Sequence, residues 1–249
     1  SLEDYPEADA VVARLCDESR EWVRVVDTIE EAEAMLGGKI TLNPLGLVLK
    51  ERKDAEGTVI GIKERLILDA RRSRTNAAAR ARQRILLPRL LDAVRNLLRH
   101  GARAIRRRRK MTKTCSWLVL DYEDAYYIIP LHPSERRFHC ARYGNKVIIF
   151  LRTGQGAKTS SLTWGHMSAL ISRLTSSLFC DTEMALETYT DDPLMAISAD
   201  TSAQSDLIAG IAIATWVVIG LRLAFHKGQR GRHVIWIGAS LRIMSRGLT

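Results

Sequence analysis

Two adjacent aspartates, Asp191 and Asp192, constrain the fold of this chain more than any other feature of its sequence. They follow Tyr189 and Thr190 and lie between two apolar-leaning runs, residues 184–186 and 193–197. This pattern predicts two strands joined by a tight turn, with both carboxylates at its tip. Adjacent acids repel each other unless a cation compensates them, and a hard divalent ion that also binds substrate phosphates is the usual compensation. An Asp-Asp pair alone is more often simple turn chemistry, so the rest of the chain decides its meaning.

The positive charge of the chain is concentrated in one region. The whole chain carries a net charge of +10, with 46% hydrophobic residues, enough for a sizeable core. Residues 1–36 hold 11 acidic residues against three arginines, whereas residues 38–110 hold 21 Lys and Arg against six acidic residues. A dense basic region predicts a polyanionic partner, either nucleic acid or an acidic membrane surface.

Cysteine spacing and hydropathy indicate the compartment of the protein and argue against a membrane-spanning segment. The four cysteines are far apart and have no metal-type spacing with the six histidines, which predicts free thiols in an intracellular compartment, cytoplasm or nucleus. The apolar stretch 207–221 has about fifteen residues, fewer than the ~20 of a membrane span, and predicts a largely buried core helix and no membrane partner. The chain begins at Ser1 without a signal-peptide pattern, so it is expected to be a piece of a longer protein.

The first half of the chain reads as an acidic helical segment, a hairpin and a basic helix. Thr28 and Glu31 have capping-box spacing and predict a helix start, and Gly37 and Gly38 predict its end. Residues 45–50 and 58–69 predict a hairpin with basic edges. Residues 77–99 have helical apolar spacing with a break at Pro88, and a basic run occupies 106–110.

The second half places an acid at the end of another strand. Residues 116–121 predict a buried strand that ends in Asp121, and a hairpin follows over 138–151. The small-residue loop 154–161 opens a helix with apolar residues every three or four positions. A helix over about 202–223 and a terminal hairpin over 234–244 complete the chain.

Six short motifs in this order resemble the reverse transcriptases of retroviruses and retrotransposons. The resemblance covers nearly all of the chain from about residue 45. Each motif alone is a weak signal, but six in the right order and spacing are very specific. They are the fingers-like segment 63–76, the acid followed by Asp-Ala-Tyr in 120–126, Gln-Gly-x-Lys-x-Ser at 155–160, Tyr-x-Asp-Asp at 189–192, the segment 220–227 that ends in Lys227, and Trp-Ile-Gly at 236–238.

The resemblance implies an α+β fold, the fingers and palm of a right-hand polymerase, with a ferredoxin-like palm sheet covered by helices on one face. It divides the chain into an acidic helical N-terminal segment (1–40), a fingers-like basic region (41–112) and a palm with the catalytic motifs and a primer-grip-like hairpin (113–249). Because the chain stops about eleven residues after Gly238, the thumb is expected to be missing or truncated. Thumb, ribonuclease H and integrase domains are expected on a full-length polyprotein.

The resemblance also implies RNA-directed DNA polymerase activity, in which deoxynucleotides are added to a primer 3′-OH by two-metal-ion phosphoryl transfer. The two ions, Mg²⁺ with Mn²⁺ as an alternative, would lie about 3.5–4 Å apart. Asp121 and Asp191 are the expected bridging ligands, with Asp192 beside them. Lys227 is the expected catalytic proton donor to the pyrophosphate leaving group, with a surface lysine as the nearly equal alternative.

The expected partners are deoxynucleoside triphosphates and an RNA or DNA template with its primer. Arg65, with either Lys50 or Lys53, would hold the triphosphate, and Gln155 would line the nucleotide pocket. Tyr126 occupies the position of the aromatic gate against the ribose 2′-OH, which implies selection of deoxynucleotides. The expected primer and template contacts are Tyr189, Thr190, Trp236 and Gly238, with the Arg-rich segment 71–110 on the phosphates.

One departure and three alternatives remain. Ser161 stands where the family has proline after the Gln-Gly-x-Lys-x-Ser motif, which puts efficiency in question rather than identity. The alternatives are a catalytically inactive or fragmentary polymerase that only binds nucleic acid, an RNA-dependent RNA polymerase, and a basic non-enzymatic module for nucleic acid or membranes. Tyr189 and Tyr126 disfavour the RNA polymerase, and the intact acids disfavour the inactive form.

Overall fold

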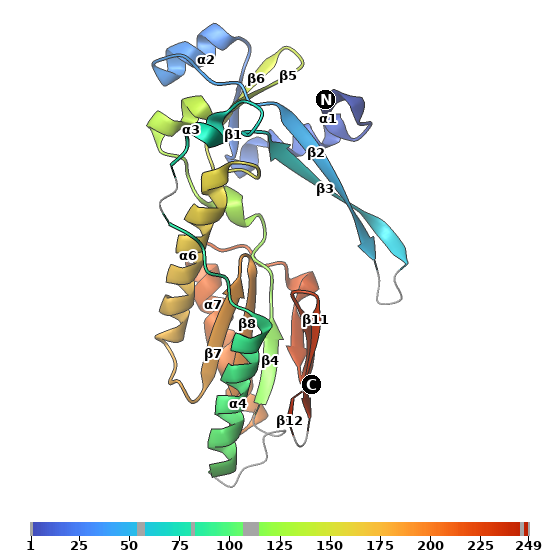
Figure 1. Ribbon diagram of the computed structural model, residues 1–249, viewed down its shortest axis with the longest axis vertical. Helices are drawn as coiled ribbons and strands as arrows, with labels where there is room; N and C mark the ends of the chain where they lie inside the picture. Colours follow the sequence, from blue (N-terminus) through green and yellow to red (C-terminus); the bar gives the residue numbers. More distant parts are fainter. Residues whose placement is uncertain (1, 54–57, 81–82, 107–114, 245–246, 249) are drawn as a thin grey trace. The chain divides into compact units, whose positions relative to one another are not determined.

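The computed structural model describes residues 2–53, 58–80, 83–106, 115–244 and 247–248 (Figure 1). Its contacts divide the chain into two compact units. Unit 1 consists of Ser1–Arg84 and Tyr126–Thr163, and unit 2 of Ile85–Ala125 and Trp164–Thr249. These units cut across the three segments expected from the sequence, because strand β6 (Lys146–Phe150) pairs with β1 (Val23–Val26) and so joins the middle of the chain to its beginning.

Unit 1 is built on two antiparallel sheets. In the first, β6 lies between β1 and β5 (Cys140–Tyr143). The second is the hairpin of β2 (Leu45–Lys53) and β3 (Val59–Leu68), as predicted. Leu45, Leu47, Leu66 and Leu68 alternate along this hairpin and join a core with Phe150 and Ile148. The helices of unit 1 are α1 (Ala8–Leu15), α2 (Ile29–Leu36), α3 (Thr75–Ala78), the start of α6 (Lys158–Ser176), and short 3-10 turns at Leu2–Asp4, Glu18–Arg20, Ala125–Ile128 and Pro133–Phe138.

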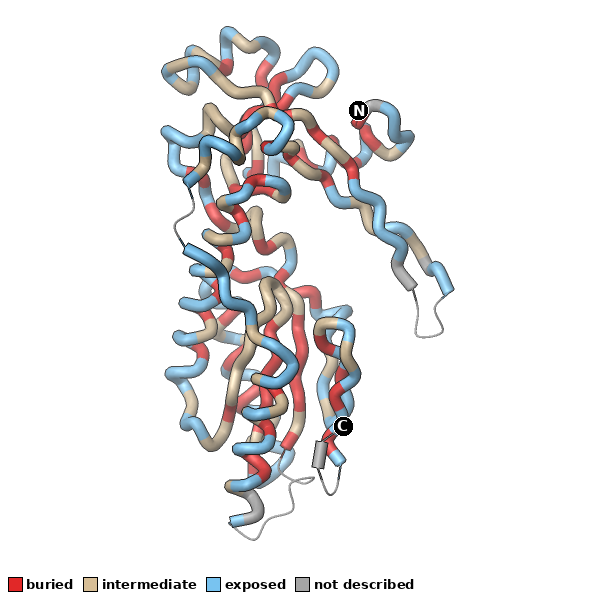
Figure 2. The backbone as a smooth tube through the Cα atoms, viewed as in Figure 1, coloured by how far each residue is buried: buried red, intermediate tan, exposed pale blue. Residues whose placement is uncertain are grey.

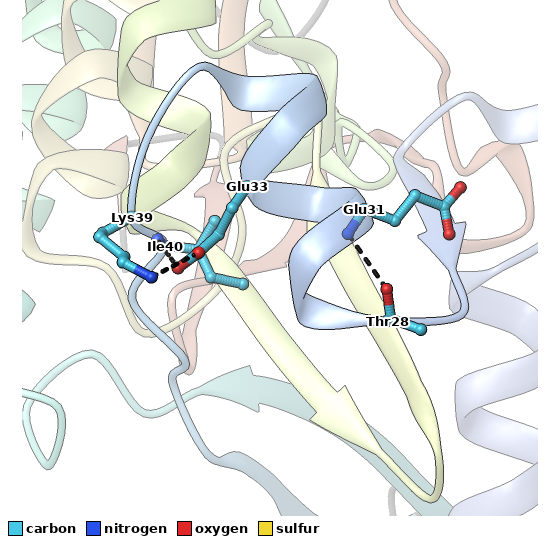
Figure 3. Close-up of polar contacts among 5 residues, drawn as sticks. All are labelled: Thr28, Glu31, Glu33, Lys39 and Ile40. Carbon is cyan, nitrogen blue, oxygen red and sulfur yellow. Dashed lines mark hydrogen bonds and ion pairs between the residues drawn. The ribbon is translucent and has the colours of Figure 1, made fainter.

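Helix α2 begins and ends where the sequence predicts (Figure 3). The Thr28 hydroxyl accepts a hydrogen bond from the Glu31 backbone N–H at 3.1 Å, which satisfies one of the donors that a helix start leaves free. Gly37 closes the helix in the left-handed conformation at φ 67°. Beyond it, the Glu33 carboxylate accepts from Lys39 Nζ at 2.8 Å and from the Ile40 N–H at 3.3 Å.

Unit 2 is a four-stranded antiparallel sheet in the order β7-β8-β4-β9. Its strands are β7 (Met184–Tyr189), β8 (Asp192–Ser198), β4 (Cys115–Val119) and β9 (Gln229–Gly231). The helices are α4 (Leu90–Arg106), the main part of α6 (Lys158–Ser176), α7 (Ser202–Val218) and a 3-10 turn at Phe225–Lys227. A second sheet holds the predicted terminal hairpin, β10 (His233–Trp236), β11 (Ala239–Met244) and β12 (Gly247–Leu248).

The unit 2 sheet buries both of its faces. Alternate residues of β4 and β8, such as Trp117 and Leu194, pack with Leu97 of α4 and with Val234 and Trp236 of the terminal hairpin. The opposite face is covered by α6 and α7, and Figure 2 shows buried residues running along β4 and β8. Burial on both faces explains why these strands are nearly continuous apolar runs in the sequence.

Two sequence expectations require correction. The segment 77–99 is less helical than expected: the break predicted at Pro88 is present and α4 begins beyond it at Leu90, because proline disfavours helix at the residue before it, but α3 ends already at Ala78. Helix α7 is not largely buried, since Leu207 is 62% exposed and Val218 84% exposed. Residues 107–110 of the basic run lie outside the described residues. None of the helices in the described ranges is long and apolar enough to cross a membrane.

Candidate active site

The predicted strand-turn-strand of the two aspartates is present in unit 2. Strands β7 and β8 pair up to Tyr189 and Asp192, so Thr190 and Asp191 form a two-residue turn. Thr190 has a φ of 56°, a backbone conformation that β-branched residues rarely adopt. Such strain persists only where the surroundings fix it, and it occurs most often at functional sites.

Asp121 lies at the same end of the sheet as this turn. It follows β4, which runs antiparallel to β8, so the end of one strand meets the start of the other. The Tyr122 backbone N–H donates to the carbonyl oxygen of Asp191 at 2.8 Å, which joins the two segments next to their acids. The Tyr122 ring packs edge-on against Trp164 and Trp216, and burial raises the pKa of its hydroxyl well above the usual value, so the group stays neutral.

Lys227 is the direct partner of Asp121 in this structure. The Asp121 carbonyl oxygen accepts from the Ala224 N–H at 3.0 Å, which brings the turn Phe225–Lys227 beside it. The Lys227 ammonium then forms an ion pair with the Asp121 carboxylate. The ammonium neutralises the acid from a position that is only partly exposed. Among the described residues, no group of three or more His, Cys, Asp or Glu side chains is gathered closely enough to hold a metal ion.

In unit 1, the pairing of β2 with β3 decides which basic side chains share a face. Val48 is opposite Arg65 and Lys50 is opposite Lys63. Paired residues and residues two apart along a strand point to the same face, so Lys50, Lys63 and Arg65 line one face of the hairpin. Lys63 was expected on a basic edge of this hairpin and at the start of the fingers-like segment, but not among the nucleotide-binding residues, and its position two residues before Arg65 in a strand is the signal that adds it to them. The side chain of Lys53 lies outside the described residues.

The small-residue loop of unit 1 is held against the end of the same hairpin. The Leu68 N–H donates to the Gln155 carbonyl oxygen at 2.8 Å. Asn76, the closing residue of the fingers-like motif, donates to the Gly156 carbonyl oxygen at 2.9 Å and accepts from the Lys158 N–H at 2.7 Å. One side chain therefore joins the first of the six motifs to the third and satisfies a donor at the start of α6.

The remaining predicted residues of unit 1 fall on ordinary turn structure. Tyr126 is half-buried in the turn Ala125–Ile128, and its carbonyl oxygen accepts from the Thr153 hydroxyl. Ser161, which replaces the family's proline, is exposed in the first turn of α6 and donates to the Lys158 carbonyl oxygen at 3.4 Å. The helix thus continues through this position.

The hairpin of β10 and β11 turns tightly through Ile237 and Gly238. Both have a positive φ, 44° and 81°, as the favoured two-residue hairpin turn requires. The Trp236 side chain is 1% exposed, and its indole N–H donates to the Asp192 carbonyl oxygen at 3.0 Å. The indole N–H of Trp236 is therefore bound to the β7–β8 turn, whereas Gly238 at the tip of the hairpin is exposed.

The fold of the chain is similar to that of solved reverse transcriptases. No family model matches the chain, and no curated protein matches its sequence. Solved structures do match over 98% of it, and they are reverse transcriptases. At the low sequence identity of these matches the likeness defines a reverse-transcriptase-like fold.

The matching structures are foamy virus protease-reverse transcriptases. One is a selenomethionine-labelled mutant of the prototype foamy virus protein, with a TM-score of 0.64 and 12% identity. Another is a foamy viral protease-reverse transcriptase in complex with double-stranded DNA, with a TM-score of 0.66 and 14% identity. The present chain spans 27% and 34% of those chains.

Proposed function

We propose that this chain is an RNA-directed DNA polymerase that adds deoxynucleotides to a primer 3′-OH. The observation that supports it most directly is the meeting of two acidic motifs at one end of one sheet. Asp121 after β4 and Asp191 in the β7–β8 turn lie on segments joined by the Tyr122–Asp191 backbone hydrogen bond. The reverse-transcriptase-like fold supports the same assignment.

The donor set at this end of the sheet fits magnesium. Mg²⁺ requires hard oxygen ligands and is usually bound by one or two carboxylates together with substrate phosphates, so a close group of three protein acids is not needed. Asp121 and Asp191 would hold the ions, with Asp192 beside them. When bound, such ions neutralise the charge that develops on the attacking and leaving oxygens.

The hairpin of unit 1 would bind the triphosphate. Arg65 and Lys50 are exposed and share one face of the hairpin. Lys63 lies on the same face, opposite Lys50 and two residues before Arg65, so this face presents positive charge to phosphate. The shared face makes Lys50 the better candidate than Lys53 for the partner of Arg65. Gln155 would line the nucleotide pocket, and Tyr126 would exclude the ribose 2′-OH.

The template and primer would contact both basic and turn residues. Arg95 and Arg99 are exposed on α4 and would bind phosphates without reading sequence. Tyr189 and Thr190 of the β7–β8 turn and the hairpin tip at Gly238 would meet the primer end. The Lys227 ammonium would serve as proton donor to the leaving group once the ion pair with Asp121 opens.

Primer extension on a poly(A)–oligo(dT) hybrid with Mg²⁺ tests the proposal. The expected result is extension with deoxynucleotides that stops when the metal is chelated. Salt-sensitive binding of the hybrid without extension, under conditions where the protein is folded, would instead identify a nucleic-acid-binding module. Equal use of ribo- and deoxynucleotides would identify an RNA polymerase.

Tyr126→Ala is expected to relax sugar selection. Removal of the ring would relieve a clash with the 2′-OH, and an overpacking clash of about 1–3 kcal/mol corresponds to a gain of about five- to 150-fold in ribonucleotide incorporation. The ratio of kcat/KM for a ribo- and a deoxynucleotide measures this gain. Tyr126→Phe should keep the wild-type ratio, and so should Tyr127→Ala, because the Tyr127 ring stacks on Trp22 at 4.2 Å. An unchanged ratio in Tyr126→Ala removes Tyr126 from the gate.

Lys227→Met is expected to tighten metal binding while it slows turnover. The ammonium and a metal ion compete for the same Asp121 carboxylate, and a partly exposed ion pair is worth at most about 1 kcal/mol, so Mn²⁺ affinity should rise by up to about fivefold. Electron paramagnetic resonance of free Mn²⁺ in the absence of nucleotide measures this affinity. Lys39→Met, which removes the partner of Glu33 in unit 1, is the matched control. Equal Mn²⁺ affinity in wild type and Lys227→Met would refute the competition.

A further inference from the structure

The β7–β8 turn is fixed by hydrogen bonds from outside the hairpin. Three successive carbonyl oxygens, those of Thr190, Asp191 and Asp192, each accept one such bond. The donors are the Trp164 indole N–H at 2.8 Å, the Tyr122 backbone N–H at 2.8 Å and the Trp236 indole N–H at 3.0 Å. Carbonyl groups at the tip of an ordinary hairpin face water instead, so this turn is held more firmly than its length requires.

The two indoles reach the turn from opposite faces of the sheet. Trp164 belongs to α6 and contacts the Tyr122 ring on the face covered by α6 and α7. Trp236 belongs to β10 and packs with Trp117 and Leu194 on the other face. Trp164 is 0% exposed and Trp236 is 1% exposed, so neither ring is free to move without opening the core.

The other buried tryptophans of unit 2 do not reach the turn. The Trp216 indole N–H donates to the Thr175 hydroxyl at 2.8 Å, which joins α7 to α6. The Trp117 indole N–H has no hydrogen-bond partner among the described residues. Both rings are 0% exposed. The four tryptophans are equally buried, but only those at 164 and 236 donate their N–H groups to the β7–β8 turn.

We infer that Trp164 and Trp236 are positioning residues for Asp191, and this inference rests on the proposed polymerase function. Bonds to the carbonyls on either side fix the backbone of Asp191, and the Tyr122 bond fixes its own carbonyl. The strained φ of Thr190 is maintained by the same contacts. The acid is thereby oriented before any ligand arrives, and substrate binding does not have to order it.

Single Phe substitutions at the four tryptophans separate the clamp from ordinary core packing. Trp164→Phe and Trp236→Phe each remove one N–H donor to the turn, whereas Trp216→Phe and Trp117→Phe remove similar ring area next to them and leave all three donors in place. Amide hydrogen exchange over residues 188–193 should accelerate about tenfold in the first pair and not in the second. In primer extension the first pair should lose about ten- to a hundredfold in kcat with an unchanged KM for the nucleotide.

Substitution by benzothienylalanine tests the same hydrogen bonds if the Phe variants do not fold. Benzothienylalanine has the shape of tryptophan but no N–H, so it removes only the hydrogen bond at position 164 or 236. Faster turn exchange with this residue supports the clamp, and unchanged exchange overturns it. Equal losses of kcat in the Trp164 and Trp216 variants also overturn it.

Hydrogen exchange and primer extension together distinguish failure of the positioning role from failure of the polymerase function. If wild-type protein does not extend a primer while the turn exchanges as described, the polymerase function is wrong and the clamp stands as a structural feature. If wild-type protein extends and Asp191→Asn does not, but the Trp164 and Trp236 variants match Trp216→Phe in both measurements, the positioning role is wrong and the polymerase function stands.

Discussion

Replacing Asp191 with asparagine is expected to abolish primer extension and leave the protein folded. The amide has the shape of the carboxylate but no charge, so it cannot compensate a divalent ion. The resulting loss should be at least about a thousandfold in kcat, which corresponds to the several kcal/mol of charge stabilisation that metal ions supply. The backbone bond from Tyr122 to the Asp191 carbonyl does not involve the side chain and should persist.

Asp181→Asn is the matched control for this variant. Asp181 is exposed in the turn that precedes β7, at the opposite end of the same hairpin from Asp191. The chemical change is the same, so the control should extend primers at the wild-type rate. Asp181→Asn should unfold in urea within about 0.5 kcal/mol of wild type, as expected for a surface change, and a cooperative urea transition should show that Asp191→Asn is folded. Wild-type activity in Asp191→Asn would reject the polymerase function outright.

Gly156→Ala is expected to unfold unit 1 or destabilise it severely. A Cβ at this position would lie 2.1 Å from the Leu68 carbonyl oxygen and 2.7 Å from Ile67 Cγ2. Gly156 also has a φ of 106°, outside the range that residues with a side chain prefer. Because the nearest atom is backbone, the loop must move away from β3, and the loss should reach about 4 kcal/mol or more.

Gly144→Ala separates the clash from the backbone conformation. Gly144 has a φ of 54°, and a Cβ there meets nothing within 4 Å, so this variant should lose only about 1–2 kcal/mol. Urea unfolding, with amide exchange of the β3 peptide to report on unit 1, compares the two. Similar losses in both variants would show that the loop can leave β3 without consequence.

The helices, strands and turns that were predicted correctly are those specified by residues close together in the sequence. The strand-turn-strand around Asp191, the capped helix at Thr28 and the terminal hairpin are all confirmed, because apolar alternation, a capping side chain and turn residues act over a few positions. The break predicted at Pro88 is confirmed by the start of α4 at Leu90, whereas α3 ends already at Ala78. Apolar spacing alone did not report this early end, because a short helix depends on tertiary packing and Leu86 in this stretch is 94% exposed. The exposed face of α7 was missed because a uniformly apolar helix carries no signal for which side is covered.

In the candidate site, too, the residues that form local motifs were predicted, whereas the hydrogen bonds between distant segments were not. Asp121, Asp191 and Asp192 were predicted from motif order, and the structure brings their segments to one end of the sheet. Lys63 was not counted among the nucleotide-binding residues, although residues two apart in a strand share a face, and only the strand register shows that Lys50 shares that face with Lys63 and Arg65. Trp236 was predicted to contact the primer, and this stays a prediction. In the structure its indole N–H donates a hydrogen bond to the Asp192 carbonyl oxygen.

By itself, the sequence determined that two acids end a strand and fill a turn, because short-range patterns of apolar and charged residues fix such elements. Only the tertiary structure decided what holds and neutralises those acids. Lys227 lies 106 positions from Asp121, and Trp236 lies 44 positions from Asp192. Contacts over such separations depend on strand register and on which helix covers which face, and no local pattern encodes either. The β7–β8 turn is thus a local feature of the sequence, and the hydrogen bonds that hold it come from distant residues.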